Sequence, residues 1–171
     1  MSAIISQCGK FRYRLERDVQ MDGLTFAYFG INPSTADATL DDATVRKWIG
    51  FTKINGGRRF IVGNVFAFRS TDVKALMRTD DPFGPANRLH LLRIADDADV
   101  LVPCWGDTKK VTGPLRHAFC HLLVELLATG KPVKTFGLTA GGDPKHPLML
   151  GYDTKLIEWN RRAPASEGEQ K

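Results

Sequence analysis

Hydrophobic residues form four short continuous runs along the chain, at 24–31, 59–66, 100–105 and 133–138. Runs of this length without polar alternation are typical of strands that are covered on both faces of a sheet. Apolar residues recur at approximately helical spacing in the segments between them, at 42–55, 85–98 and 115–128. Gly56 and Gly130 follow the first and last of these segments, where a helix is expected to end. An additional strand is expected at 11–19 and a short helix at 73–78.

The order of these elements predicts the fold class. Strands that alternate with helices indicate an α/β protein, a three-layer αβα sandwich around a central, mostly parallel sheet of four strands. Residues 1–160 are expected to form one domain, and the polar segment 161–171 a disordered tail. In such sheets ligands bind beyond the carboxyl ends of the strands. The segments that follow the strands are therefore the places to look for functional residues.

Composition and charge narrow the class of protein. A hydrophobic fraction of 43% in 171 residues supports a packed core and excludes a largely disordered chain. No apolar run is long enough to span a bilayer, and the first ten residues lack the pattern of a signal peptide. A cytoplasmic location without membrane contact is expected. The formal net charge of +5 is compatible with a polyanionic partner.

The three cysteines are Cys8, Cys104 and Cys120. They are scattered and odd in number, which suits a reducing compartment and suggests no disulfide framework. Because the chain has no CxxC pair, neither a metal site nor another cofactor is expected. Cys104 and Cys120 stand in apolar stretches and are expected to be buried.

One asparagine follows the first predicted strand, and another lies within the second. Asn32 precedes Pro33, which stiffens the turn. Its carbonyl oxygen can accept a hydrogen bond from a water molecule, or its amide can simply close the turn. Asn64 lies inside an apolar strand, where its amide can recognise the edge of a base or bond to neighbouring backbone. Arg69 leaves the sheet at the same end, either to contact phosphate or as a solvated side chain.

The last two predicted strands also end at polar residues. Lys109 and Lys110 follow the third strand and can bind phosphate or belong to a solvated turn. His146 lies in the glycine- and proline-rich loop after the fourth strand. It can donate a hydrogen bond to a base carbonyl that gains charge, or it can be structural. Each of these polar features alone is weak evidence for a functional site. Their occurrence at the ends of all four predicted strands is stronger evidence.

These segments, in this order, resemble the uracil-DNA glycosylase superfamily. Residues 30–33 (Gly-Ile-Asn-Pro) look like the first motif of its mismatch-specific branch, and residues 146–148 (His-Pro-Leu) look like the second. Residues 63–69 resemble the strand whose asparagine recognises the flipped base. More closely, the chain resembles a bacterial and phage branch catalogued as domain of unknown function 1643. The match covers residues 24–150.

The resemblance implies a role for each matching position. Asn32 would position the attacking water, Asn64 would recognise the base edge, and His146 would stabilise the departing base. The other residues that it implies fall into two groups: base contacts from Ile31 and from the stacking candidates Trp48, Phe66 and Phe68, and DNA contacts from Ser34, Thr35, Arg69, Lys109, Lys110, Lys145 and Pro147. Ser34 and Thr35 replace the glycine common in the mismatch branch, which leaves the excised base open.

The function that this resemblance implies is that of a monofunctional DNA N-glycosylase. It would flip a pyrimidine out of DNA and hydrolyse its glycosidic bond to leave an abasic site. The phage and bacterial distribution of the branch suggests a modified base of phage DNA, such as glucosylated hydroxymethylcytosine, and a role in anti-phage defence. DNA is the expected partner, with no obligate protein partner. Lys53 or Lys145 could add strand cleavage through a Schiff base, which is not favoured. Two alternatives stay open: a non-catalytic DNA-binding module, and a hydrolase of free modified nucleosides or nucleotides.

Overall fold

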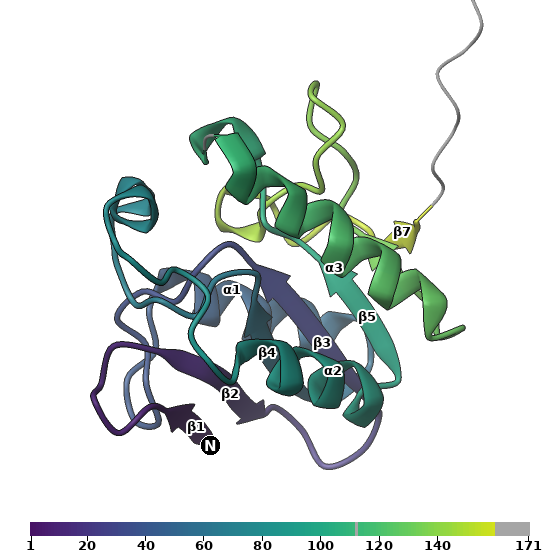
Figure 1. Ribbon diagram of the computed structural model, residues 1–171. Coiled ribbons are helices and arrows are strands. Elements are labelled where there is room, and N and C mark those ends of the chain that lie inside the picture. Colours follow the sequence, from purple (N-terminus) through teal and green to yellow (C-terminus); the bar gives the residue numbers. More distant parts are fainter. Residues whose placement is uncertain (112, 160–171) are drawn as a thin grey trace, which may run out of the picture.

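A five-stranded mixed sheet forms the centre of the molecule (Figure 1). The computed structural model describes residues 1–111 and 113–159. In spatial order the strands are β1 (Ser2–Ile5), β2 (Arg12–Asp18), β4 (Gly57–Asn64), β3 (Leu24–Gly30) and β5 (Val100–Pro103). Strand β3 is parallel to both β4 and β5, whereas β2 is antiparallel to both β1 and β4. The α/β class and the strand at 11–19 are thereby confirmed.

The expected four-stranded, mostly parallel sheet is wrong in its edge strands. Of the predicted fourth strand, Val133 forms only an isolated parallel bridge with Leu101. The strand β6 (Lys134–Thr135) pairs instead with β7 (Ile157–Glu158) in a separate antiparallel pair. Gly137 has a φ of 94°, a conformation that does not continue a strand. The other side of the sheet gains the hairpin of β1 and β2, of which β1 was not predicted.

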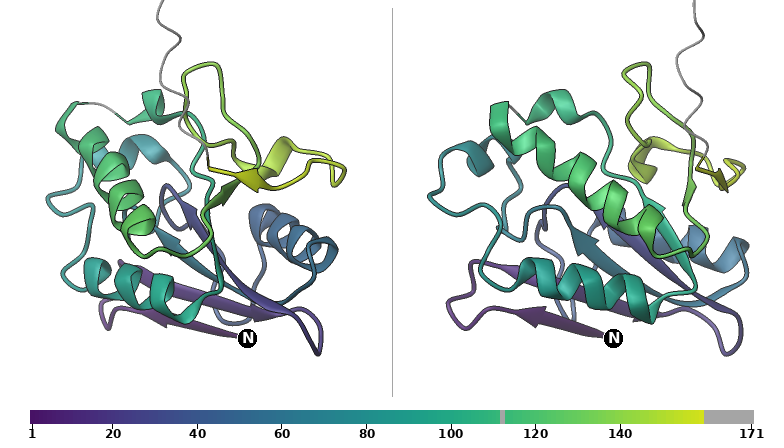
Figure 2. Two further views of the ribbon diagram at one scale, coloured as in Figure 1. Left: turned by 90° about the vertical axis from the view of Figure 1, so that its right-hand side faces the viewer. Right: turned by 45° about the vertical axis from the view of Figure 1, so that its right-hand side comes forward.

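Helices cover both faces of the sheet. The three predicted helices are confirmed as α1 (Ala43–Ile54), α2 (Asn87–Asp97) and α3 (His117–Ala128). Figure 2 shows α1 on one face and both α2 and α3 on the other. Successive side chains of β3 alternate between these faces: Phe26 and Tyr28 pack on the side of α1, and Ala27 and Phe29 on the side of α2 and α3. This burial on both faces explains why the strand is a continuous apolar run.

Local sequence signals set the ends of α1. The Asp42 carboxylate accepts a hydrogen bond from the backbone N–H of Val45 (2.9 Å) and caps the first turn. Gly56, with a φ of 72°, ends the helix as expected. The predicted short helix at 73–78 is the 3₁₀ helix η1 (Val73–Met77). Three more 3₁₀ turns follow β5 and β6: η2 (Thr108–Lys110), η3 (Gly113–Arg116) and η4 (Pro147–Met149).

The connections place a switch point at the end of β3. From β3 the chain crosses one face through α1 to reach β4, and from β4 it crosses the other face through α2 to reach β5. Because β4 and β5 flank β3, the two connections diverge above its carboxyl end, which is where such sheets bind ligands. The antiparallel strand β2 begins at this same edge.

Three remaining expectations concern residues away from this edge. Cys104 is buried as predicted, whereas Cys120 is exposed, because it does not belong to the buried face of α3 formed by Phe119, Leu122 and Leu126. Within the described residues, none of the helices combines the length and hydrophobicity needed to cross a membrane. The predicted tail at 161–171 lies outside the described residues.

Candidate functional site

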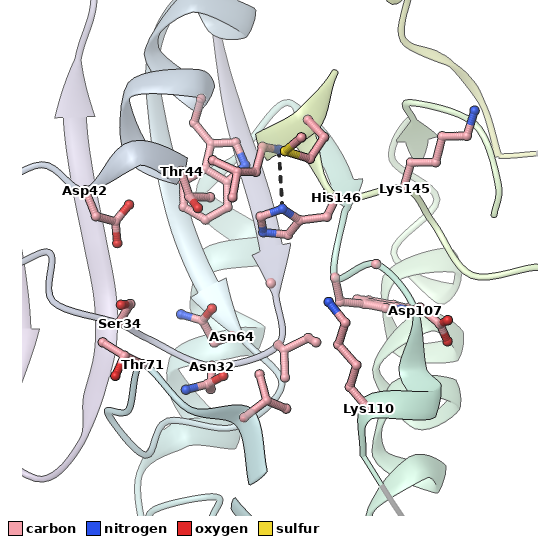
Figure 3. Close-up of a pocket in the computed structure, with 18 of the residues that line it drawn as sticks. Asn32, Ser34, Asp42, Thr44, Asn64, Thr71, Asp107, Lys110, Lys145 and His146 are labelled. Atoms are coloured by element: carbon pink, nitrogen blue, oxygen red, sulfur yellow. Dashed lines mark hydrogen bonds between the residues drawn. The ribbon is translucent and has the colours of Figure 1, made fainter. Parts of the chain in front are cut away.

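A pocket of about 550 Å³ opens at the carboxyl edge of β3, β4 and β5. The residues that line it come from the loops after these strands, from the segment between β6 and β7, from the first half of α1 and from the start of β2. Of the residues singled out in the sequence, those that line it are Ile31, Asn32, Ser34, Trp48, Asn64, Lys110, Lys145 and His146. Figure 3 shows Asn32 and Asn64 side by side, with His146 and Lys110 facing them from one side.

The side-chain amide of Asn32 is held in one orientation. Its Nδ2 donates to the carbonyl oxygens of Ser70 (2.8 Å), Pro33 (3.1 Å) and Phe68 (3.4 Å). Because all three partners are carbonyl oxygens, the side-chain atom that faces them must be the amide nitrogen. The positions of Nδ2 and Oδ1 are therefore assigned by these contacts. Within the described part of the chain, Oδ1 accepts no hydrogen bond, so it is available as an acceptor in the pocket.

Asn64 is buried, with 3% of its surface exposed, and it lines the pocket. Its side-chain amide forms no hydrogen bond with any other described residue, while its backbone oxygen accepts from Nδ2 of Asn87 (3.0 Å). A glycine at position 30 makes room for it, since a Cβ there would lie 2.8 Å from Oδ1 of Asn64. A buried amide costs free energy unless it is paired, so this side chain is suited to bind a polar ligand.

His146 lies at the start of η4, and its imidazole is neutral at physiological pH. Burial lowers its pKa from 6.5 to about 4, and Lys110 adds to this effect, whereas Asp42 opposes it. The Nδ1 atom accepts a hydrogen bond from the backbone N–H of Leu148 (3.3 Å). A neutral imidazole whose Nδ1 is an acceptor carries its proton on Nε2. Figure 3 shows that Nε2 faces the asparagines, so His146 presents a neutral donor to the pocket.

The two lysines of the pocket differ in direction. The side chain of Lys110 extends toward His146, and that of Lys145 extends away from the asparagines (Figure 3). Both residues are exposed at the rim of the pocket. Asp107, also on the rim, accepts from the backbone N–H of Lys109 (2.8 Å) and begins η2. The rim therefore carries both charges and is not a uniformly basic surface.

Several predicted site residues do not line the pocket: Thr35, Phe66, Phe68, Arg69, Lys109 and Pro147. The fully buried Phe66 packs against Phe83 and Phe119 at ring-centroid distances of 5.1 Å and 5.6 Å. Phe68 packs against Phe11. Arg69 donates to the backbone oxygen of Gly9 (3.3 Å). The chain changes direction after β4, so the side chains of Phe66, Phe68 and Arg69 lie away from the pocket. Asn64, the last residue of β4, faces the pocket.

Two tryptophans contribute the aromatic surface of the pocket. Trp48 was one of three predicted stacking candidates, and its ring is already stacked on Tyr28, with centroids 5.7 Å apart. Trp105, which was overlooked, is the last residue of the third apolar run and is 3% exposed. Its position at the end of β5 is the signal that could have identified it.

Other lining residues were missed because their place depends on tertiary structure. They are Arg12, from the start of β2, Asp42 and Thr44, from the start of α1, and Ser70 and Thr71, from the loop after β4. Figure 3 shows Ser34, Asp42 and Thr71 across the asparagines from His146. The pocket thus has one wall of hydroxyl groups and another that carries His146 and Lys110.

The sequence expectation of no metal site overlooked one pattern. His117 and His121 stand four residues apart on α3, a spacing that can place two imidazoles on one helix face. They line a separate pocket between α3 and α2, together with Glu125. Within the described residues, no group of three or more histidine, cysteine or acidic side chains could hold a metal ion.

The fold and the pocket define an α/β protein with a pocket at the switch point of its sheet, lined in part by polar side chains. A family model described as "Protein of unknown function (DUF1643)" matches residues 12–148. The chain belongs to this family, as its motifs at 30–37, 64–69 and 146–148 predicted. Comparison with curated proteins found no match, and neither did comparison with solved structures. The relation to the uracil-DNA glycosylase superfamily stays a prediction.

Proposed function

We propose that the protein is a monofunctional DNA N-glycosylase with a fold of the uracil-DNA glycosylase type. The observation that supports this most is the convergence of Asn32, Asn64 and His146 on one pocket. They come from three chain segments, each of which resembles a glycosylase segment in the same order. The pocket volume of about 550 Å³ is within the range that binds small molecules and suits a flipped nucleotide.

Asn32 would position the water that attacks the sugar. Its amide nitrogen is held by three backbone carbonyls, so Oδ1 is the atom that can accept a hydrogen bond from water. An amide oxygen is too weak a base to create hydroxide. It fits a reaction in which the glycosidic bond breaks first and water adds to an oxocarbenium-like sugar. Orientation of the water is then the contribution required of the side chain.

His146 and Asn64 would act on the base. As the bond breaks, the base gains negative charge on its carbonyl oxygen. A neutral Nε2–H donor in a half-buried position can stabilise that charge as it develops. Asn64 offers one donor and one acceptor, which suits the edge of a pyrimidine. Its lack of a side-chain partner within the described residues supports this role, because a bound base would supply one.

The proposed substrate is DNA that carries a modified pyrimidine. Support for the modification comes from the phage and bacterial distribution of the branch that the motifs resemble. The substrate would be excised in anti-phage defence, for example from DNA with glucosylated hydroxymethylcytosine. The product is an abasic site and the free base.

The test is an assay of abasic sites in phage DNA with and without the modified base. The purified protein is incubated with each DNA, and the aldehydes of abasic sites are labelled. Abasic sites in one DNA only, absent with Asn32→Ala and with His146→Gln, would support the proposal and identify the class of base. His121→Gln is the matched control, because it makes the same substitution at an exposed histidine of α3 that does not line the pocket.

Two other results would replace the proposal. If the protein binds DNA in a salt-sensitive manner and produces no abasic sites in any DNA, it is a non-catalytic binding module. If it releases bases from free modified nucleosides or nucleotides, with DNA inactive as a substrate, it is a hydrolase of small molecules.

A further inference from the structure

Arg12 is a buried guanidinium group in the wall of the pocket. Only 3% of its surface is exposed. Its Nη1 donates to the backbone oxygen of Ala36 (2.6 Å), and its buried Nε has no hydrogen-bond partner among the described residues. No carboxylate of the described chain lies within the 4.0 Å distance of an ion pair. A buried charge without a counter-charge is costly, and burial accordingly lowers the pKa of Arg12 to about 10.

Arg17 on the same strand shows how the chain compensates a buried arginine elsewhere. It is 1% exposed, and its Nε donates to the carboxylate of Asp41 (2.8 Å). Its other nitrogens donate to the backbone oxygens of Glu16 (2.8 Å) and Asp37 (2.5 Å). Arg17 is thus paired and satisfied within the protein. Arg12 differs from it in two respects, because it has no carboxylate partner and it borders the pocket.

An irregularity in the hairpin directs Arg12 to the pocket. The register between β1 and β2 shifts at this point, so that Ile5 pairs with Arg12 and Ile4 with Arg14. Tyr13 stacks on His90 and Arg14 pairs with Asp97, and both of these partners belong to α2. Arg12 instead contacts Ala36 on the opposite face of the sheet. The shift leaves one extra residue in β2, which is a β-bulge. Bulges commonly redirect a side chain next to a functional site.

Hydroxyl groups surround the same end of the pocket. Ser34 and Thr71 line it from two loops, and Thr44 lines the pocket from the first turn of α1, whereas the hydroxyl of Ser70 is bonded to the backbone of Asp72. The backbone dipoles of a helix favour an anion at this position. Asp42 is also present, and its attraction raises the pKa of Arg12 without reaching ion-pair distance. This end of the pocket lies across Asn32 and Asn64 from His146 (Figure 3).

We propose that Arg12 forms a phosphate subsite, with the hydroxyl groups of Ser34 and Thr71 beside it. The guanidinium fork would bind the non-bridging oxygens of the phosphate attached to the sugar of the bound nucleotide. The position of the base between Asn64 and His146 rests on the proposed function. The phosphate subsite itself does not, since it follows from the unpaired guanidinium. The phosphate can belong to a DNA strand or to a free nucleotide.

The experiment measures binding by the full chain with three probes at constant ionic strength. They are inorganic phosphate, deoxyuridine 5′-monophosphate, and a five-nucleotide single strand with a central abasic analogue. The wild-type protein is expected to bind at least one phosphate probe, and Arg12→Gln to weaken that binding about tenfold to a hundredfold. Preference for the single strand identifies the phosphate as a diester of DNA, and preference for the monophosphate as that of a free nucleotide.

Arg58→Gln is the matched control for charge. Arg58 is exposed at the start of β4, at the opposite edge of the sheet from the pocket, and does not line it, so its replacement removes the same positive charge as Arg12→Gln. Its affinity for the probes is expected to stay within about twofold of wild type, because it makes no direct contact with the proposed subsite. Equal losses in both variants would overturn the subsite in favour of diffuse attraction.

Asp42→Asn tests the proposal without change to Arg12. Asparagine also caps helices, so α1 is expected to keep its first turn. Removal of the competing carboxylate is expected to tighten phosphate binding. Three results overturn the subsite: no binding of any probe by the wild type, unchanged binding by Arg12→Gln, or weaker binding by Asp42→Asn. None of these readouts involves abasic sites, so the subsite and the glycosylase proposal can fail separately.

Discussion

The backbone N–H of Leu148 donates a hydrogen bond to Nδ1 of His146 over 3.3 Å. This contact lies within the turn that begins η4, and it determines the tautomer of the neutral ring. The proton is left on Nε2, which faces Asn32 and Asn64 in the pocket (Figure 3). The local turn thereby prepares the donor, and burial keeps it neutral.

The neutral state of His146 predicts a pH dependence of stability. The unfolded histidine titrates near 6.5 and the folded one near 4. Between these values the unfolded chain binds a proton that the folded chain does not, so the free energy of unfolding falls as the pH is lowered from 6.5 to 4. The loss from this group is expected to be about 2 kcal/mol at a pH of about 4.5.

The measurement is urea unfolding of wild type and His146→Gln at neutral and acidic pH. Glutamine cannot gain the proton, so the stability difference between the two proteins is expected to change by that amount as the pH falls. Other titrating groups affect both proteins alike. A difference that stays constant with pH would contradict the neutral state of the half-buried His146.

Gly30 predicts a change in binding with little change in stability. A Cβ at this position would lie 2.8 Å from Oδ1 of Asn64. Because that oxygen is the end of a side chain that can rotate, Gly30→Ala is expected to displace the amide and to leave the strand intact. Affinity for the substrate is expected to fall about tenfold, which is the cost of one lost hydrogen bond to a buried partner. Calorimetric titration and a thermal melt would separate the two effects, and normal binding would show that Asn64 does not contact the ligand.

Asn87 predicts a large effect on stability from a residue outside the pocket. Its Nδ2 donates to the backbone oxygens of Asn64 (3.0 Å) and Val65 (3.1 Å), and so ties the start of α2 to the end of β4. Asn87→Ala removes this donor from two buried carbonyls and is expected to destabilise the fold by about 2–4 kcal/mol in urea unfolding. Arg88→Ala is the control on the same helix: its side chain is 81% exposed, and loss of its ion pair with Glu125 is expected to cost less than about 1 kcal/mol.

Gly106 and Gly130 form a matched pair for a fourth prediction. Both have positive φ angles, 79° and 72°, so alanine at either position is expected to cost about 1–2 kcal/mol. A Cβ at Gly106 would also lie 3.1 Å from Cβ of His146, whereas nothing lies within 4 Å of one at Gly130. Gly106→Ala alone is expected to shift the NMR signals of the His146 ring and to reduce substrate turnover. Unchanged His146 signals in Gly106→Ala would contradict this coupling.

Several site residues could be predicted because they are tied to local patterns. Asn32, Asn64 and His146 follow or end apolar runs, and parallel strands bring their carboxyl ends to one edge. The directions in which side chains point after the ends of the strands could not be predicted in the same way. Phe66 and Phe68 stand in the same motif as Asn64, yet the chain leaves regular strand geometry after Asn64 and both rings pack away from the pocket.

The sequence by itself determined the three long helices, the strands β2 to β5 and the polar residues near the strand ends, because hydrophobic periodicity and helix-ending glycines act over a few residues. Only the tertiary structure decided which strands pair and in which direction. Residues from the segment at 133–138 pair with β7 outside the central sheet, and β2 belongs to the central sheet as an antiparallel strand. Arg12 therefore reached the pocket from the beginning of a strand, through an irregular pairing with β1. Strand direction and register depend on contacts between distant residues, and no local pattern contains them.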